Sequence, residues 1–266
     1  MGTGGGKPPA VSPAPPGQDA PPPARFPEVD LLRGTAVLAM VISNFLFDLS
    51  FFVGISSIPA AAAAMLARLT AGAFLTIAGV SLVLRRRRLR GRPHPFLPYL
   101  RRGGWLILLG MLVSVATWVA AGQQFVVFGV LHCIGVATLL AYPLLAIPWL
   151  AGLAGLFFVC GRPLLALLPP FGPWLIPLGI APTGFASVDY VPLVPWAGWV
   201  FLGVWLGSVL YPESRTRSWL PGRPVAWPLR LIAVAGRHSL LVYFVHQPLL
   251  LGGIWVVLQA RRVLGG

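Results

Sequence analysis

Runs of apolar residues long enough to cross a lipid bilayer constrain this chain more than any other feature of its sequence. Several stretches continue for about 20 residues without a charged side chain, which is the length of a membrane-spanning α-helix. Only 10% of the residues are charged and 57% are hydrophobic, whereas soluble domains carry about 25% charged residues. Too few polar residues are present to cover a water-soluble surface. The sequence therefore predicts an all-α bundle of transmembrane helices, that is, an integral membrane protein.

Prolines, glycines and charges divide the apolar runs into about seven predicted spans within one domain, residues 29–266. Residues 1–28 are rich in Pro, Gly and Ala and contain no apolar run, so we expect a disordered cytoplasmic tail. This tail lacks the apolar segment of a signal peptide, and the first span is expected to be retained. The predicted spans are residues 31–53, 60–84, 103–121, 125–145, 148–168, 193–210 and 231–258.

Arginines indicate which ends of the spans face the cytoplasm. The net charge is +14, and arginines gather in the loop 85–92 and again between 215 and 230. Both loops lie inside if the N-terminus is cytoplasmic, as the positive-inside rule favours. This topology explains the basic charge without a nucleic-acid partner. We expect the chain in the cytoplasmic (inner) membrane of a bacterium.

The two cysteines, Cys133 and Cys160, fall inside apolar runs. No Cys or His spacing typical of a metal site is present, so no metal is expected. We predict two buried free thiols.

Polar residues inside the predicted spans are the first candidates for function, because burying them in lipid is costly. In the first span Arg33 and Asn44 are eleven residues apart, almost three helical turns, and share a face; Asp48 lies one turn further. Structural explanations remain open. Asp30 and Arg33 can pair at a helix end, and Asp48 can mark a solvated end.

Two histidines lie in later spans. His132 is about two turns into the fourth span, and His246, with Gln247, lies in the outer half of the seventh. Ser239 and Tyr243 fall near the same face of that span. A lone intramembrane histidine can also be a simple helix–helix contact.

Asp189 and Tyr190 precede the sixth span on its outer side, where a plain loop turn is the alternative. With the predicted orientation, polar residues from four distant segments converge on the outer half of the membrane, which favours a shared polar cavity. Histidine beside a carboxylate suits general acid–base chemistry near neutral pH. The converging residues are Asn44, Asp48, His132, Asp189 and His246.

Four motifs contain these polar residues. The first is D-x-x-R-G-x-A-x-x-x-M at residues 30–40, followed by Asn44 and F-L-F-D-L at 45–49. The second is F-G-V-L-H-C-I-G at 128–135, and the third is D-Y-V-P-L-V-P-W at 189–196. The fourth is G-R-H-S-L at 236–240 with Tyr243 and H-Q-P at 246–248. In this order they resemble the bacterial branch of the heparan-α-glucosaminide N-acetyltransferase catalytic family.

The resemblance implies an enzyme that moves an acetyl group from acetyl-CoA across the membrane to a sugar amine or hydroxyl. It places Asn44 near the acyl-transfer centre. Many bacterial relatives carry His at that position, and eukaryotic relatives place their proposed catalytic His shortly after the Asn, where this chain has Ile55. The base is therefore expected to be His132 or His246.

The remaining candidates have assigned roles as well. We expect Asp48 to act with the histidines, Arg33 or Arg237 to hold a CoA phosphate, and Asn44 or Tyr243 to stabilise the oxyanion. Further candidates for substrate or cofactor binding are Asp189, Tyr190, Ser239 and Gln247.

Two other classes of function remain open from the sequence. Intramembrane Asp and His are also typical of a proton-coupled transporter or flippase, although no internal repeat is present. A non-catalytic membrane subunit is the third alternative. The expected partners are the lipid bilayer, an acyl-CoA and a glycan or glycolipid acceptor, with a homo-oligomer left open.

Overall fold

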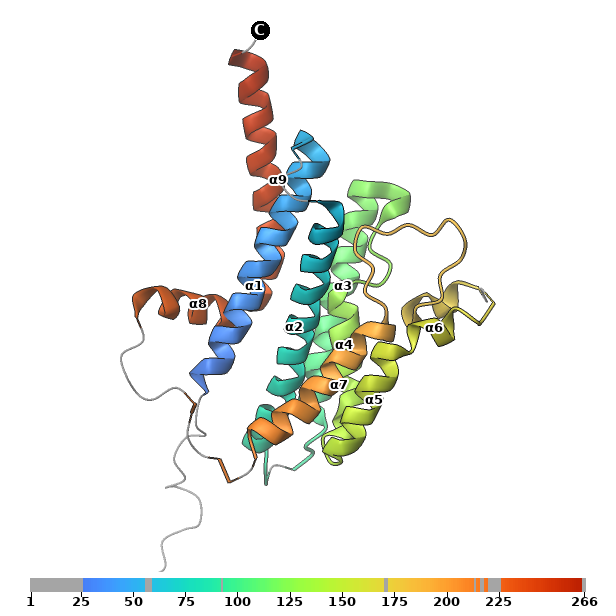
Figure 1. Ribbon diagram of the computed structural model, residues 1–266, viewed down its shortest axis with the longest axis vertical. Coiled ribbons are helices and arrows are strands. Elements are labelled where there is room, and N and C mark those ends of the chain that lie inside the picture. The colour runs from blue at the N-terminus through green and yellow to red at the C-terminus, as the bar shows by residue number, and fades with distance from the viewer. Residues whose placement is uncertain are drawn as a thin grey trace, which may run out of the picture.

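The computed structural model describes residues 26–55, 59–91, 93–169, 172–212, 214–215, 218–219 and 226–264. Helices are the main regular structure of these ranges, and no β-strand occurs in them, so the predicted all-α fold is confirmed. The helices pack into an elongated bundle in which α9 extends beyond the others (Figure 1). Nearly all of the predicted N-terminal tail lies outside the described residues, and α1 begins at Pro27.

Five of the described helices are long and apolar enough to cross a membrane. They confirm an integral membrane bundle. Two shorter apolar helices, α4 (Val130–Leu144) and α5 (Pro148–Cys160), pack among them. At about 1.5 Å per residue, α4 is roughly 22 Å long, below the roughly 30 Å of a hydrocarbon core. Seven complete spans therefore remain a prediction. The five long helices are α1 (Pro27–Asp48, extended by the π-helical turn Leu49–Val53), α2 (Ala60–Arg88), α3 (Leu97–Ala121), α7 (Leu193–Leu210) and α9 (Ser239–Leu264).

Three predicted boundaries are wrong, each for a local reason. Residues 125–129 are not helical, because Phe128 forms a parallel bridge with Tyr190. The fifth span ends at Cys160, and a separate short helix, α6 (Arg162–Leu165), follows. The seventh span is split at His238, which has non-helical φ and ψ, into α8 (Trp227–Arg237) and α9. The short 3₁₀ helices η2 (Gly122–Gln124) and η3 (Pro173–Leu178) complete the fold.

Helix α8 packs against α1 and lies across it near the arginine-rich end of the bundle (Figure 1). The two backbones touch at Gly34 and Gly236. A Cβ at Gly34 would collide with the carbonyl of Ile232, and one at Gly236 with the carbonyl of Asp30. This close crossing explains why residues 231–237 do not continue the apolar α9.

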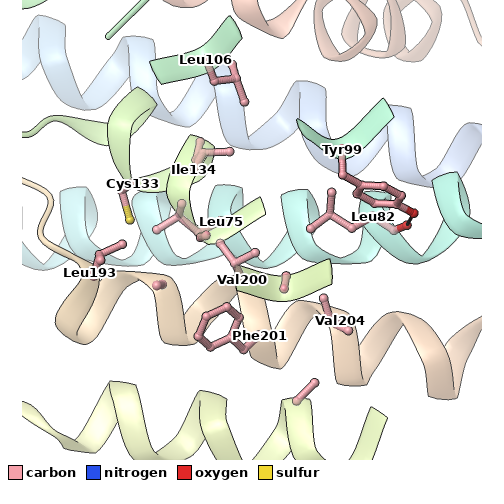
Figure 2. Packing of buried hydrophobic residues seen from close by; sticks show 14 of the residues in the cluster. Leu75, Leu82, Tyr99, Leu106, Cys133, Ile134, Leu193, Val200, Phe201 and Val204 are labelled. Carbon is pink, nitrogen blue, oxygen red and sulfur yellow. Dashed lines mark hydrogen bonds between the residues drawn. The ribbon is translucent and has the colours of Figure 1, made fainter. Parts of the chain in front are cut away.

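The hydrophobic core lies where α2, α4 and α7 meet, and α5 covers the other side of α7. Leu75, Val200 and Val204 are fully buried there (Figure 2). Gly79 and Gly203 let the α2 and α7 backbones touch, since small residues allow close helix packing in membranes. Cys133 is buried as predicted, but Cys160 is exposed, so that part of the prediction is wrong.

The basic segments gather at one end of the bundle. Arg86, near the end of α2, donates to the carbonyl of Leu145, and Arg87 donates to that of Arg215 at 2.6 Å. The ring of Phe26, before α1, packs edge-on against Tyr211 at 4.9 Å. The ends of α1, α2 and α7 therefore lie together. Their cytoplasmic placement stays a prediction.

Candidate functional site

Asn44 and His246 meet across the contact between α1 and α9. Nδ2 of Asn44 lies 2.7 Å from Nε2 of His246. Nδ1 of His246 lies 2.7 Å from the carbonyl of Tyr243 and 3.2 Å from that of Val242. Because carbonyls only accept, Nδ1 carries the proton in the neutral ring and the Nε2 lone pair accepts from Asn44. The hydrogen bonds thus orient His246 with its basic nitrogen toward α1.

Asp48 and Gln247 form a second pair one turn further along α1. Nε2 of Gln247 donates to both carboxylate oxygens of Asp48, at 3.2 and 3.1 Å. Asp48 is only 1% exposed, so it does not mark a solvated helix end. Two adjacent polar pairs therefore hold the register of α9 against α1.

His132 lies at the start of α4, away from these pairs. The N–H of Gly129 donates to Nδ1 of His132 at 3.3 Å, so the neutral ring carries its proton on Nε2. The ring stacks on Phe128 at 5.4 Å and packs against Gly110 of α3. His132 is buried, and these contacts orient it oppositely to His246: it presents an N–H rather than a lone pair.

Asp189 caps the same helix from the loop before α7. Its Oδ2 accepts a hydrogen bond from the N–H of Val130 at 3.2 Å, where the positive end of the helix dipole favours a carboxylate. Desolvation nevertheless raises the pKa of the Asp189 carboxyl above its usual value, and the Val130 hydrogen bond opposes that rise. Asp189 is thus more than a loop turn, because it connects the loop to the start of α4.

The rest of this loop is fastened in the same way. The N–H of Val191 donates to the carbonyl of Phe128 at 2.9 Å, and the hydroxyl of Ser187 donates to that of Phe125 at 2.9 Å. The hydroxyl of Tyr190 donates to the carbonyl of Ile176 at 2.7 Å. Among the described residues, Tyr190 makes no hydrogen bond to the polar pairs of α1 and α9. Its position indicates a structural role for Tyr190.

A cavity of about 610 Å³ runs from the arginine-rich end into the bundle. At the arginine-rich end of the bundle the cavity lining is strongly basic. Deeper in the bundle the cavity reaches Tyr243 and the first residues of α4. Of the predicted binding residues, Arg33, Arg237, Ser239 and Tyr243 line it. Its basic lining consists of Arg33, Arg85, Arg88, Arg102 and Arg237.

Arg33 is held inside this cavity by several partners. Its guanidinium contacts Asp30 at 3.1 Å, so the predicted pair at the helix end forms, and it donates to the hydroxyl of Ser81 at 2.6 Å. A longer hydrogen bond of 3.5 Å reaches the carbonyl of Gly236. Arg33 thereby joins α1, α2 and α8 and positions one cation in the lining.

The polar residues predicted to share one cavity therefore lie in separate places: the Asn44–His246 and Asp48–Gln247 pairs between α1 and α9, and His132 with Asp189 at the start of α4, both apart from the arginine-lined cavity. The lining of the 610 Å³ cavity does not include Asn44, Asp48, His132 or His246. Tyr243 connects the cavity to His246, one turn away on α9, with ring centroids 5.9 Å apart. Val130 lines the cavity and also hydrogen-bonds Asp189.

Three cavity arginines, Arg85, Arg88 and Arg102, were missed by sequence reasoning. Charge at the ends of spans is explained by topology alone, so nothing in the pattern separates an inward-facing arginine from a loop arginine. The helical period does place Arg85 and Arg88 on one face of the helix. That shared face is the one sequence feature that indicates a common environment for them.

The fold and this site define an integral membrane helical bundle with a basic internal cavity that leads to Tyr243, beside the buried His246. A family model described as heparan-alpha-glucosaminide N-acetyltransferase, catalytic, matches residues 25–248. The chain belongs to this family of membrane acetyltransferases, which in general use acetyl-CoA as donor. The family predicted from the four motifs is thereby confirmed. No curated protein and no solved structure matches the chain.

Proposed function

We propose that this protein transfers an acetyl group from acetyl-CoA to an amine or hydroxyl of a sugar that approaches from the opposite end of the bundle. The observation that carries the proposal is the cavity that joins five arginines to Tyr243, one turn before His246. A donor bound at one end and an acceptor at the other would meet near this Tyr–His pair.

The donor half of the proposal rests on charge and size. Phosphates are well held by arginine, which offers several N–H donors in a planar fork. Asp30 is the one acidic side chain in the described lining, and it already pairs with Arg33. The volume of about 610 Å³ falls within the roughly 300–1,000 Å³ of ordinary small-molecule sites. These residues fit an acyl-CoA whose phosphates lie among the arginines.

The acyl end would lie deeper, where the cavity is lined by Tyr243 and apolar residues of α4. The Tyr243 hydroxyl has no hydrogen-bond partner among the described residues, so it is available to donate to a developing oxyanion. Asn44, the other candidate, has its amide turned to His246. Tyr243 is therefore the better-placed donor.

The two histidines suit different roles. The acceptor nitrogen or oxygen would bond to the acetyl carbon, the carbon–sulfur bond would break, and CoA would leave as its thiolate. The acceptor proton would go to Nε2 of His246, in place of the hydrogen bond from Asn44, and then to the thiolate. Nε2 of His246 holds a lone pair in the neutral ring, whereas His132 presents an N–H. His246 is therefore assigned as the base, while Asn44 orients it and the Asp48–Gln247 pair holds its helix in place.

The proposal is tested with purified protein and radiolabelled acetyl-CoA, measuring binding and CoA release in the presence of a hexosamine acceptor. We expect His246→Gln to keep donor binding while turnover falls by about 10²–10⁴-fold, as for loss of a general base. His238→Gln is the matched control, because His238 is exposed at the α8–α9 junction. Failure of the wild-type protein to bind acetyl-CoA overturns the proposal. Proton-coupled uptake into liposomes without CoA favours the transporter instead.

A further inference from the structure

On one side of the arginine cavity the two flanking helices, α3 and α9, are not closely packed against each other. Four of the long apolar helices, α1, α2, α3 and α9, and the shorter α4 contribute lining residues. Around the cavity, α9 packs on α1, α1 on α2, α2 on α4, and α4 on α3. Among the described residues α3 and α9 form no such packed pair. We call the side of the ring between α3 and α9 the gap, because these two helices are not closely packed against each other in the described residues, and in a bilayer this side would face lipid.

The residues at the edges of the gap have an amphipathic character. Trp105 of α3 lines the cavity and is nevertheless 56% exposed. Arg102, one turn earlier, and Leu240 of α9 also line it. Outside the gap, α3 and α9 present exposed leucines to lipid, such as Leu108 and Leu241. A tryptophan beside an arginine at the rim is typical of the membrane interface.

In a bilayer, the gap would lie near the depth of the lipid headgroups. Arg102 is five residues after the start of α3, about 7.5 Å along the helix. Ser239, also in the lining, is the first residue of α9. Headgroup regions are on the order of 5–8 Å thick, the difference between a whole bilayer and its hydrocarbon core shared between two leaflets. In a bilayer whose surface lies at the start of α3, Arg102 would therefore be near the level of the phosphates of the leaflet at this end.

The cavity arginines also lack counter-charges. Apart from Arg33, no arginine of the lining has an ion pair with a described acidic residue. Nε of Arg85 is buried without a hydrogen-bond partner in the described part of the chain. The Arg85 guanidinium also donates from Nη2 to the carbonyl of Pro98 at 3.2 Å, so it is the lack of counter-charges among these arginines, more than this one buried atom, that favours an anion with several acceptor oxygens.

We propose that an anionic phospholipid from the leaflet at the arginine-rich end enters this cavity sideways between α3 and α9. Its phosphate lies among Arg85, Arg102 and Arg237, and its acyl chains leave past Trp105 and Leu240. A lipid is favoured over a soluble phosphate because the gap opens toward the bilayer at headgroup depth. The inference does not depend on acetyl transfer, although a lipid and an acyl-CoA in the same cavity would compete.

Native mass spectrometry tests this with protein in a neutral detergent and equal amounts of phosphatidylglycerol and phosphatidylcholine of the same chain length. We expect selective retention of phosphatidylglycerol. Arg102→Gln should lower that retention by about tenfold, the equivalent of one lost charge-assisted hydrogen bond. Arg101→Gln is the matched control: it removes the neighbouring arginine of the same helix, which does not line the cavity.

Two further arms identify the source of the phosphate and the route. Glycerol 1-phosphate, which has no chains, should bind far more weakly than the lipid. Ser239→Trp, which narrows the gap, should reduce retention of the lipid. Equal losses in Arg101→Gln and Arg102→Gln, or glycerol 1-phosphate binding as tight as that of the lipid, overturn the inference. If the purified protein binds acetyl-CoA but retains no phosphatidylglycerol, this inference fails while the proposed function stands.

Discussion

Nδ2 of Asn44 lies 2.7 Å from Nε2 of His246, although the two residues are 202 positions apart in the chain. One turn further, Gln247 bonds both oxygens of Asp48. These pairs join the first and last long helices of the bundle, and they place His246 beside Tyr243 at the inner part of the cavity.

Replacing Asn44 should affect the orientation of His246 more than the binding of the donor. We expect Asn44→Ala to lower kcat by roughly tenfold, because one hydrogen bond to the ring is worth about 1–1.5 kcal/mol. The KM for acetyl-CoA should change little, since Asn44 does not line the cavity. Steady-state kinetics measure both. Thr35→Ala is the control, because the Thr35 hydroxyl bonds only the carbonyl of Leu31; a rise in KM with unchanged kcat contradicts the assignment.

Replacing the Tyr243 hydroxyl should slow the chemical step. Loss of one oxyanion donor lowers turnover by about 10²–10³-fold, and Tyr243→Phe keeps the aromatic contact with His246. Single-turnover CoA release gives the rate. Tyr142→Phe, on α4 at the arginine-rich end, serves as control and should leave it unchanged. Equal rates for Tyr243→Phe and wild type rule out this role.

The Asp48–Gln247 pair should contribute to stability. Gln247→Ala leaves a buried carboxylate without its partner, at a cost of about 1–3 kcal/mol. Thermal unfolding in detergent should show a lower Tm. Gln259→Ala tests another glutamine of α9 and should have little effect. The double variant Asp48→Leu, Gln247→Leu removes the buried carboxylate as well and should therefore be more stable than Gln247→Ala. If it is not, the loss in Gln247→Ala does not come from the unpaired Asp48 carboxylate.

Asp189 predicts a pH dependence of stability. Its pKa in the folded protein is raised by desolvation, so the folded state binds the proton more tightly than the unfolded chain does. The stabilisation is complete below the unfolded pKa of about 3.9 and is lost as pH rises through the folded pKa. The Tm of Asp189→Asn should therefore fall less than that of wild type between about pH 4 and pH 8.

Asparagine retains an acceptor for the Val130 N–H, so Asp189→Asn separates charge from capping. Asp189→Ala removes the acceptor as well and should be less stable than Asp189→Asn by about 0.5–2 kcal/mol at every pH, because neither variant titrates at this position. Identical pH slopes for wild type and Asp189→Asn would show that the carboxyl does not titrate in this range.

Two glycines give opposite predictions for the same substitution. A Cβ at Gly203 would collide with the backbone of Thr76 on α2, so Gly203→Ala should destabilise the bundle by about 1–3 kcal/mol. A Cβ at Gly104, on α3, would meet no atom within 4 Å. Gly104→Ala should therefore be neutral or stabilising by up to about 1 kcal/mol. Matched losses of Tm in both variants contradict the close α2–α7 crossing.

Hydropathy alone predicted the helices that are longest and most apolar, because about 20 apolar residues have few alternatives to crossing a bilayer. It failed where an apolar run contains a local break. Residues 231–258 read as one span, yet the chain turns at His238, since Gly34 and Gly236 bring α8 tightly across α1. Close backbone approach between distant segments leaves no mark in a hydropathy profile.

The sequence by itself determined the membrane class, the family motifs and most of the residues worth testing. It did not determine which of them touch. Tertiary structure alone decided that Asn44 bonds His246, that Asp189 caps α4, and that Arg85, Arg88 and Arg102 turn into a cavity. The physical reason is that a helical period places residues on a face, while the packing of helices from distant parts of the chain decides what each face meets.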